Sequence, residues 1–123
     1  MNRLGNVRRG DIWTVDFSIP AGAEAAYRRP AVIVSNNGAN QSATQLGRGV
    51  VTVVPVTGNV RKVYPFQVRL HARSCGLSRD SKAQAEQVRA VAIERLQARI
   101  GRVPFRTMDE IDGALRLHLH LDL

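Results

Sequence analysis

"RRPAVIVSN", residues 28–36, places two arginines and Pro30 directly before a run of apolar, mostly β-branched residues. The segment 30–35 is apolar almost throughout, which is typical of a strand buried on both faces and therefore central in a sheet. Arginines beside a buried strand are commonly solvated flanking charges. That interpretation competes with a binding role for Arg28 and Arg29.

Further strands are predicted on either side of this segment. Residues 10–17 alternate apolar and polar side chains after a glycine, and "VVTVVPVT" at 50–57 is the clearest strand of the chain. Pro55 cannot donate to a ladder, so it places that end of the strand at an edge or a bulge. Residues 66–72 alternate as a half-solvated strand. We expect the polar stretch 36–49 to be a long loop.

The C-terminal third is ambiguous by pattern. Residues 81–101 are rich in helix formers, but 87–93 also alternate, and we predict a strand there followed by a helical turn at 94–99. Thr107 and Glu110 have the spacing of a capping box, which predicts a helix to about residue 118 and an extended tail.

Composition indicates one basic domain spanning 1–123. Eighteen Lys and Arg against ten Asp and Glu give a net charge of +8, and sixteen of these cations are arginine. This excess favours a polyanionic partner, although a merely soluble basic protein would look the same. Cys75 is the single cysteine, expected to be an inert buried thiol. With no secretion signal and no apolar run of membrane-spanning length, a cytoplasmic protein without membrane contact is expected.

The absence of several enzyme motifs excludes classes of reaction for this chain. No P-loop, dinucleotide-binding glycine motif or serine-hydrolase elbow occurs. His118 and His120 lack the further ligands that a zinc site needs, so neither a metal nor a cofactor is expected. If the strands that begin at Pro30 and end at Thr57 pair, Arg29 and Thr57 would meet at one rim of the sheet. A guanidinium and a hydroxyl there would form a phosphate site.

Five segments in order carry a family resemblance: "RRGDIWTVDF" (8–17), "RRPAVIVSN" (28–36), "VVTVVPVT" (50–57), "YPFQVRL" (64–70) and "RDSKAQAEQVRAVAIERL" (79–96). Together they resemble the MazF/PemK (Kid) family of toxin endoribonucleases from type II toxin–antitoxin systems. The resemblance implies a mainly β fold, an SH3-like, strongly curved β-barrel of the CcdB/Kid/MazF kind. Short helical additions and a C-terminal helix would complete it, and the protein would act as a homodimer.

The resemblance also implies an activity. It would be sequence-specific, metal-independent cleavage of single-stranded RNA (mRNA, rRNA or tRNA) to a 2′,3′-cyclic phosphate and a 5′-hydroxyl. Translation and growth would stop until an acidic, MazE-like antitoxin neutralised the toxin. Matching the motifs assigns catalysis to Arg29, Thr57 and Glu24. Contacts with RNA are assigned to Arg28, Asn36, Lys62 and Gln87.

Two other functions remain open at this point. One is a toxin of the same barrel that poisons DNA gyrase by binding it, as the CcdB group does, and the other is an RNA-binding module without catalysis. The general base is also open: arginine is a poor proton acceptor, and Glu24 is the alternative.

Overall fold

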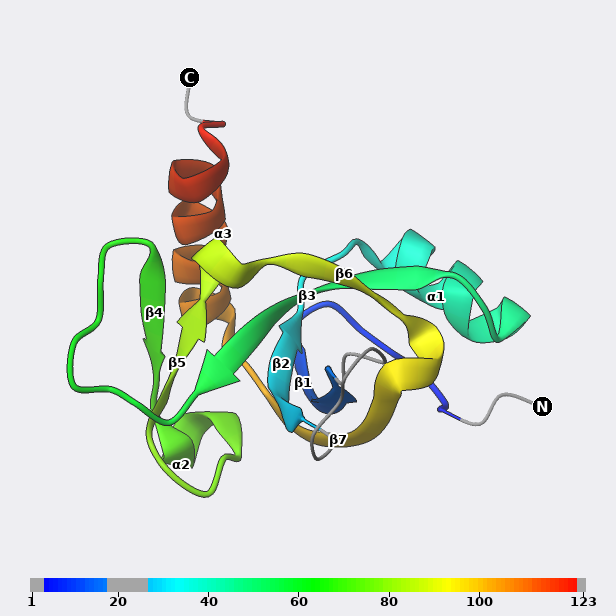
Figure 1. The fold of residues 1–123 in the computed structure, drawn as a ribbon, viewed down its shortest axis with the longest axis horizontal. Helices are drawn as coiled ribbons and strands as arrows, with labels where there is room; N and C mark the ends of the chain where they lie inside the picture. Colours follow the sequence, from blue (N-terminus) through cyan, green and yellow to red (C-terminus); the bar gives the residue numbers. More distant parts are fainter. Residues whose placement is uncertain (1–3, 18–26, 122–123) are drawn as a thin grey trace.

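Strands dominate the fold (Figure 1). The computed structural model describes residues 4–17 and 27–121. In these ranges the strands are β1 (Asp11–Asp16), β2 (Arg28–Ile33), β3 (Val50–Thr57), β4 (Gln67–Leu70), β5 (Ser81–Gln84), β6 (Arg89–Ala92) and β7 (Leu96–Arg102). The helices are α1 (Asn37–Leu46), α2 (Ala72–Cys75) and α3 (Phe105–Leu119), with 3-10 turns η1 (Ala85–Gln87) and η2 (Ile93–Arg95).

The seven strands form one antiparallel sheet in the order β4-β5-β3-β2-β1-β7, with β6 also paired to β3. The sheet curls so that β6 and β7, joined by η2, wrap around β1 and β2 (Figure 1). The predicted mainly β, strongly curved fold is confirmed, although the sheet curls without closing into a complete barrel.

Two hydrophobic clusters cover the two faces of the central strands. Ile12, Val32 and Val54 belong to the cluster under α3, whereas neighbouring residues Trp13 and Ala31 belong to the cluster inside the curl. Successive side chains of a strand point to opposite faces, so a strand buried on both faces must be apolar at every position. This explains the continuous apolar runs and confirms that the strand beginning near Pro30 is central.

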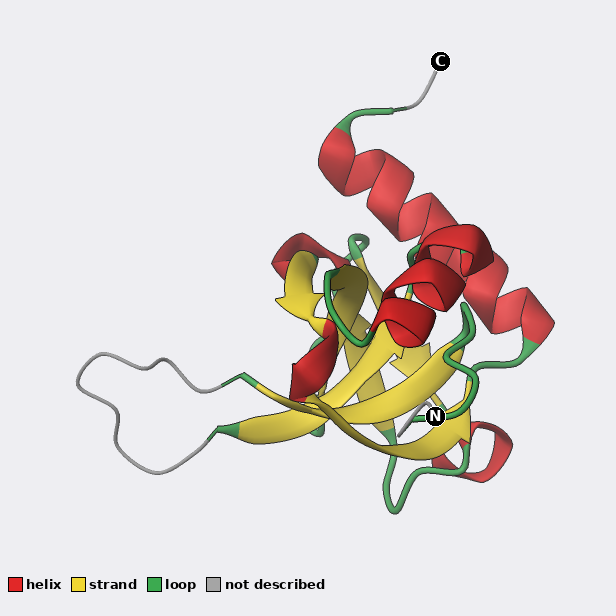
Figure 2. Cartoon of the chain, turned by 90° about the vertical axis from the view of Figure 1, so that its right-hand side faces the viewer, coloured by secondary structure: helices red, strands yellow, loops and turns green. Residues whose placement is uncertain are grey.

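The C-terminal helix exists as predicted, but its start differs. α3 begins at Phe105 with Pro104 as N-cap, and no side chain caps it. The expected capping box of Thr107 and Glu110 is therefore wrong, because proline suits a helix start without a side-chain cap. Ile111 anchors the buried face of α3, and the C-terminal end projects beyond the strands (Figure 2). No helix among the described residues is long and apolar enough to span a membrane.

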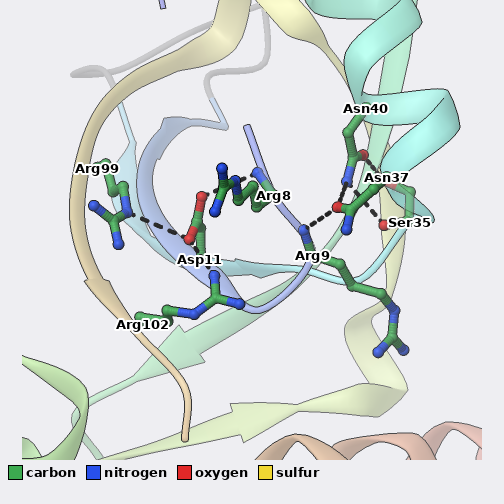
Figure 3. Close-up of polar contacts among 8 residues, drawn as sticks. All are labelled: Arg8, Arg9, Asp11, Ser35, Asn37, Asn40, Arg99 and Arg102. Atoms are coloured by element: carbon green, nitrogen blue, oxygen red, sulfur yellow. Dashed lines mark hydrogen bonds and ion pairs between the residues drawn. The ribbon is translucent and has the colours of Figure 1, made fainter. Parts of the chain in front are cut away.

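The expected loop at 36–49 is wrong: most of it is α1. Asn36 caps the helix by accepting from the Ala39 N–H at 2.8 Å, and Gly47 ends it with a φ of 67°. The buried Asn40 bonds to Ser35 through both its amide oxygen and its amide nitrogen (Figure 3). Caps at both ends and a satisfied buried amide outweigh the low helix propensity of the segment.

The region 81–102 is more extended than expected. The predicted strand at 87–93 is present as β6, but the helical turn predicted at 94–99 is wrong, because β7 begins at Leu96. β5 was not anticipated, because its residues favour helices by propensity and pair only through tertiary context. β3 pairs with β6 as far as Val53 and with β5 from Val56, so Pro55 sits where the strand changes partner.

The strand predicted at 66–72 is β4, which is shorter and less solvated than expected. Gln67 falls on the polar side of the alternating pattern, for which a half-solvated strand predicts exposure, but it is buried. Its side-chain nitrogen donates to Glu86 Oε2 at 2.7 Å, and its oxygen accepts from the Tyr64 N–H at 3.2 Å. A buried amide is tolerated there because its hydrogen bonds are made.

Cys75 lies in the cluster under α3, as expected for a structural thiol. Burial raises the pKa of this thiol, and the Ser74 hydroxyl opposes the shift more weakly. The protonated form that results is a poor nucleophile.

Two glycines give a matched test of the packing between β7 and α2. A Cβ at Gly101 would overlap the backbone oxygen of Cys75, whereas a Cβ at Gly113, on the exposed side of α3, would touch nothing. Gly101→Ala should lower the free energy of unfolding by about 3 kcal/mol, the upper range for overpacking. Gly113→Ala should raise it by about 0.5–1 kcal/mol, because alanine favours a helix. Urea denaturation of both variants measures this, and equal effects would contradict the close approach.

Candidate active site

Arg29 and Thr57 lie at neighbouring strand ends. β2 and β3 are antiparallel with Ala31 opposite Pro55, and continuing this register places Arg29 opposite Thr57. The Arg29 Nε donates to the backbone oxygen of Val56 at 3.1 Å. The two side chains that were expected to converge therefore share one rim of the sheet.

The Arg29 guanidinium is held at three points. Besides the bond from Nε, its Nη1 donates to the Tyr27 hydroxyl at 2.8 Å, and its Nη2 donates to Gln84 Oε1. The Tyr27 ring also lies 5.5 Å from the guanidinium carbon. A guanidinium has five N–H donors, and among the described residues one N–H on each terminal nitrogen of Arg29 has no partner. Within that part of the chain, this is a fixed cation with two donors left for a ligand.

Lys82 brings a second cation to the same rim. It lies opposite Thr57 across β3 and β5, and its side chain is only 7% exposed. Its ammonium donates to the backbone oxygen of Lys62 at 2.6 Å. Lys82 thus ties the 58–66 loop to the sheet from the strand position opposite Thr57. The Thr57 hydroxyl accepts from the Asn59 N–H at 3.3 Å.

The 58–66 loop carries an aromatic pair next to these cations. Tyr64 and Phe66 stack with centroids 5.4 Å apart and planes 7° from parallel. The Lys62 ammonium lies 4.7 Å from the Tyr64 ring centroid, a cation–π distance. Tyr64 is 41% exposed, so its ring is available for stacking.

Arg79 reaches the site from the segment before β5. A Cβ added at Gly58 would overlap the Arg79 guanidinium, so that group lies directly against the backbone of the residue after Thr57. A larger residue at position 58 would displace this guanidinium.

The sequence did not single out Gln84, Lys82 or Arg79. Lys82 and Gln84 alternate with two alanines, which is the pattern of a strand with one polar face. Helix propensity in the same segment obscured that signal. Arg79 had no signal in the sequence, because its place depends on a contact between distant segments.

The other residues expected at the site are placed as follows. Arg28 is exposed at the start of β2, opposite Asp16 and next to Arg29, and Lys62 is exposed in the 58–66 loop. Asn36 caps α1 at the far end of β2, roughly 20 Å from Arg29 at about 3.3 Å per residue. Gln87 is exposed at the end of η1, and no hydrogen bond links it to Arg29 within the described ranges. Glu24 lies outside the described residues.

The described part of the chain brings no three His, Cys, Asp or Glu side chains together at metal-binding distance. His118 lies in the last turn of α3, and His120 is its C-cap with a φ of 57°. The donors that lie at this rim, on neighbouring strand positions and beside the loop after Thr57, are Arg29, Thr57, Lys82 and Arg79. Such a set suits the oxygen atoms of a phosphate.

Comparison with known proteins identifies the family of the chain. A family model described as "PemK-like, MazF-like toxin of type II toxin-antitoxin system" matches residues 8–119. Endoribonuclease MazF9 of Mycobacterium tuberculosis is 58% identical over 94% of this chain and 98% of its own. Endoribonuclease EndoA of Bacillus subtilis is 30% identical over 94% of this chain and 96% of its own.

Solved structures show the same fold. An endoribonuclease in complex with its cognate antitoxin from a mycobacterial species has a TM-score of 0.72 and 25% identity, covering 98% of this chain and 99% of its own. The MazE–MazF crystal structure from Deinococcus radiodurans (Form-II) has a TM-score of 0.77 and 27% identity, covering 94% and 97%. With a family model over most of its length and a full-length relative at 58% identity, the chain belongs to the PemK-like, MazF-like toxins of type II toxin–antitoxin systems.

Proposed function

We propose that this chain is an endoribonuclease toxin that cleaves single-stranded RNA without a metal ion, leaving a 2′,3′-cyclic phosphate and a 5′-hydroxyl. The endoribonuclease assignment is supported by the relatives of that name, which align over most of the chain. The observation that carries the chemistry is the Arg29 guanidinium, held by Val56, Tyr27 and Gln84 opposite Thr57 with two N–H groups to spare.

In this reaction the ribose 2′-oxygen bonds to the adjacent phosphorus, and the bond from phosphorus to the 5′-oxygen breaks. The 2′-hydroxyl loses one proton and the 5′-oxygen gains one, so no other reactant is consumed. Negative charge builds on the phosphoryl oxygens in the transition state. A cation already fixed at that position stabilises the transition state more than the ground state, which is the role that we assign to Arg29.

Thr57 and Lys82 complete the phosphate site in this proposal. The Thr57 hydroxyl donates to a phosphoryl oxygen, and the nearby ammonium adds positive charge. Arginine stays protonated at neutral pH, so Glu24 is the group to which we assign acceptance of the 2′-hydroxyl proton.

Flanking nucleotides are assigned to the walls of the site. The exposed Tyr64 ring offers a stacking surface with Lys62 above it, and Arg28 lies exposed beside Arg29 at the start of β2. Asn36 and Gln87 lie farther away, and we assign them to nucleotides beyond the scissile bond or to a second copy of the chain. The proposed setting is the cytoplasm, where cleavage of mRNA, rRNA or tRNA would stop translation and growth.

The proposed partners are a second copy of this chain and an acidic antitoxin of the MazE type. Solved relatives are described in complex with a cognate antitoxin or as MazE–MazF assemblies. The net charge of +8 and the cationic rim support an acidic, disordered peptide as the inhibitor, because it would gain charge-assisted contacts as it ordered.

Substituting each of the two adjacent arginines separates catalysis from binding. Arg29→Ala should lower the cleavage rate by about 10²–10³-fold, the typical loss for a main charge-stabilising donor. Arg28→Ala should weaken RNA binding with a salt slope smaller by about 0.7, the value for one contact to single-stranded RNA, and leave turnover measurable. Single-turnover cleavage and binding across a salt series measure both effects. Opposite behaviour of the two variants would show that the wrong arginine has been assigned to catalysis.

Chelation tests the metal-independent chemistry. Cleavage in EDTA should proceed at the same rate as without it, because the assigned groups are Arg29, Thr57, Lys82 and Glu24. Loss of activity in chelator, restored by zinc or magnesium, would reassign the chemistry to a metal and bring His118 and His120 back as ligands.

Inhibition by the antitoxin should occur by occlusion of the same rim. Hydrogen exchange of the complex should show protection at residues 28–29 and across the 58–66 loop, and the affinity should fall as salt rises. Protection confined to α3, with the rim exchanging freely, would be incompatible with occlusion.

A further inference from the structure

Asp11 is the centre of a second arginine cluster, away from Arg29. Its carboxylate is 2% exposed; Oδ1 accepts from Arg102 Nη1 at 2.7 Å and pairs with Arg99 Nε at 3.3 Å. Oδ2 accepts from the backbone N–H of Arg8 at 3.0 Å. Figure 3 shows the three arginines around this one carboxylate.

A register shift in the pairing of β1 with β7 builds the cluster. Arg99 and Arg102 are three residues apart, so in a regular strand their side chains would point to opposite faces. The pairing shifts by one residue between Ile12 and Trp13, so Arg102 falls opposite Asp11 and Arg99 opposite Trp13, on one face. Such a shift re-aims side chains, and here it aims two guanidinium groups at one point.

The cluster keeps most of its charge and most of its donors. Arg8, Arg99 and Arg102 against Asp11 leave a net charge of +2, and no other carboxylate among the described residues is ion-paired with them. Each paired guanidinium gives Asp11 one of its five N–H groups. The side chains of Arg99 and Arg102 are 53% and 51% exposed. The buried carboxylate thus orients two half-exposed guanidinium groups, which keep N–H donors for a ligand.

A cavity of about 470 Å³ lies beside these groups and is lined by Arg8, Asp11, Arg99, Arg102 and Trp13. Trp13 is 4% exposed and its indole nitrogen is inaccessible, so the donors that this wall presents come from the half-exposed guanidinium groups of Arg99 and Arg102.

We propose that this cavity binds a second backbone phosphate of the RNA, so that the protein contacts the substrate both at Arg29 and at the Asp11 cluster. The inference rests on the proposed function. Val15 of β1 lies between Arg29 of β2 and Leu96 of β7. The start of β7 is therefore two strands away from Arg29, and β7 continues from there to the Asp11 cluster. Spacings of about 4.8 Å per strand and 3.3 Å per residue put the two phosphate positions roughly 20 Å apart.

RNA suits this arrangement better than an acidic peptide does, because one continuous polyanion would connect both cationic ends. Near the Arg29 end of β7, Arg95 donates to the backbone oxygen of Asp16, the residue opposite Arg28. An RNA strand extending past Arg28 would therefore meet Arg95 before it reached Arg99 and Arg102. Non-specific phosphate contacts of this kind add affinity without reading bases.

The test compares a long RNA with a short oligonucleotide that carries the same mapped cleavage site and only a few flanking nucleotides. The variant R99Q/R102Q removes both charges, while its amide groups can still donate to Asp11. The matched control, R106Q/R116Q, removes the same charge from exposed positions on α3. Binding is measured on an R29A background across a salt series, and cleavage on the wild-type background.

For R99Q/R102Q we expect a loss of affinity for the long RNA on the order of tenfold. The salt slope should fall by about 1.4, for two contacts at about 0.7 each. Cleavage of the short oligonucleotide should be unchanged. Equal effects of R99Q/R102Q and R106Q/R116Q, or no effect of either, would overturn the second site. Loss of affinity for an acidic antitoxin with RNA binding intact would reassign the cavity to the peptide.

A separate measurement needs no substitution at the cluster. In the R29A protein, the arginine Nε–H signals of Arg99 and Arg102 should shift in NMR spectra with the long RNA but not with the short one. Signals that stay fixed in both titrations would exclude the second site even if R99Q/R102Q failed to fold. Failure of the proposed function is seen independently: the unsubstituted protein would then cleave neither RNA.

Discussion

The antiparallel pairing of β2 with β3, buried on both faces, is the constraint on which the rest of the structure depends. A slip of one residue would move Val32 and Val54 out of the cluster under α3 and Ala31 into it, so the register is strongly specified. The same register sets Arg29 opposite Thr57. The site is therefore positioned by hydrophobic burial in the middle of the strands, and the polar residues at their ends follow from it.

The hydrogen bonds that hold Arg29 link this strand pairing to the proposed catalysis. Pro30 restricts the backbone next to Arg29, and the Val56 carbonyl, the Tyr27 hydroxyl and the Gln84 amide hold the guanidinium. A cation held before the substrate arrives needs little reorganisation when charge develops on a phosphate. This answers why two arginines precede a buried strand: Arg28 remains exposed, whereas Arg29 is fixed by three elements of the sheet and its neighbourhood.

A glycine and an irregular strand place further arginines beside the two proposed phosphate sites. Gly58 lets Arg79 lie against the backbone beside Thr57, and a register shift in β7 turns Arg99 and Arg102 toward Asp11. In a regular strand these two arginines would lie on opposite faces. Part of the positive charge is thus held in two groups of guanidiniums, oriented by protein acceptors such as Gln84 and Asp11.

The amino-acid sequence by itself determined the central strands, the C-terminal helix and the family, because continuous apolar runs and ordered motifs are local signals. The meeting of Arg29 with Thr57 followed from the sequence only on condition that their two strands pair, and that pairing is a tertiary contact. It did not determine α1, whose stability comes from the buried Asn40 and from caps at both ends that compete with poor propensity. Nor did it determine β5, and with it the placing of Lys82 and Gln84. Only the tertiary structure decided which distant groups meet Arg29 and Asp11, because strand partners, bulges and close glycine contacts depend on segments far apart in the chain.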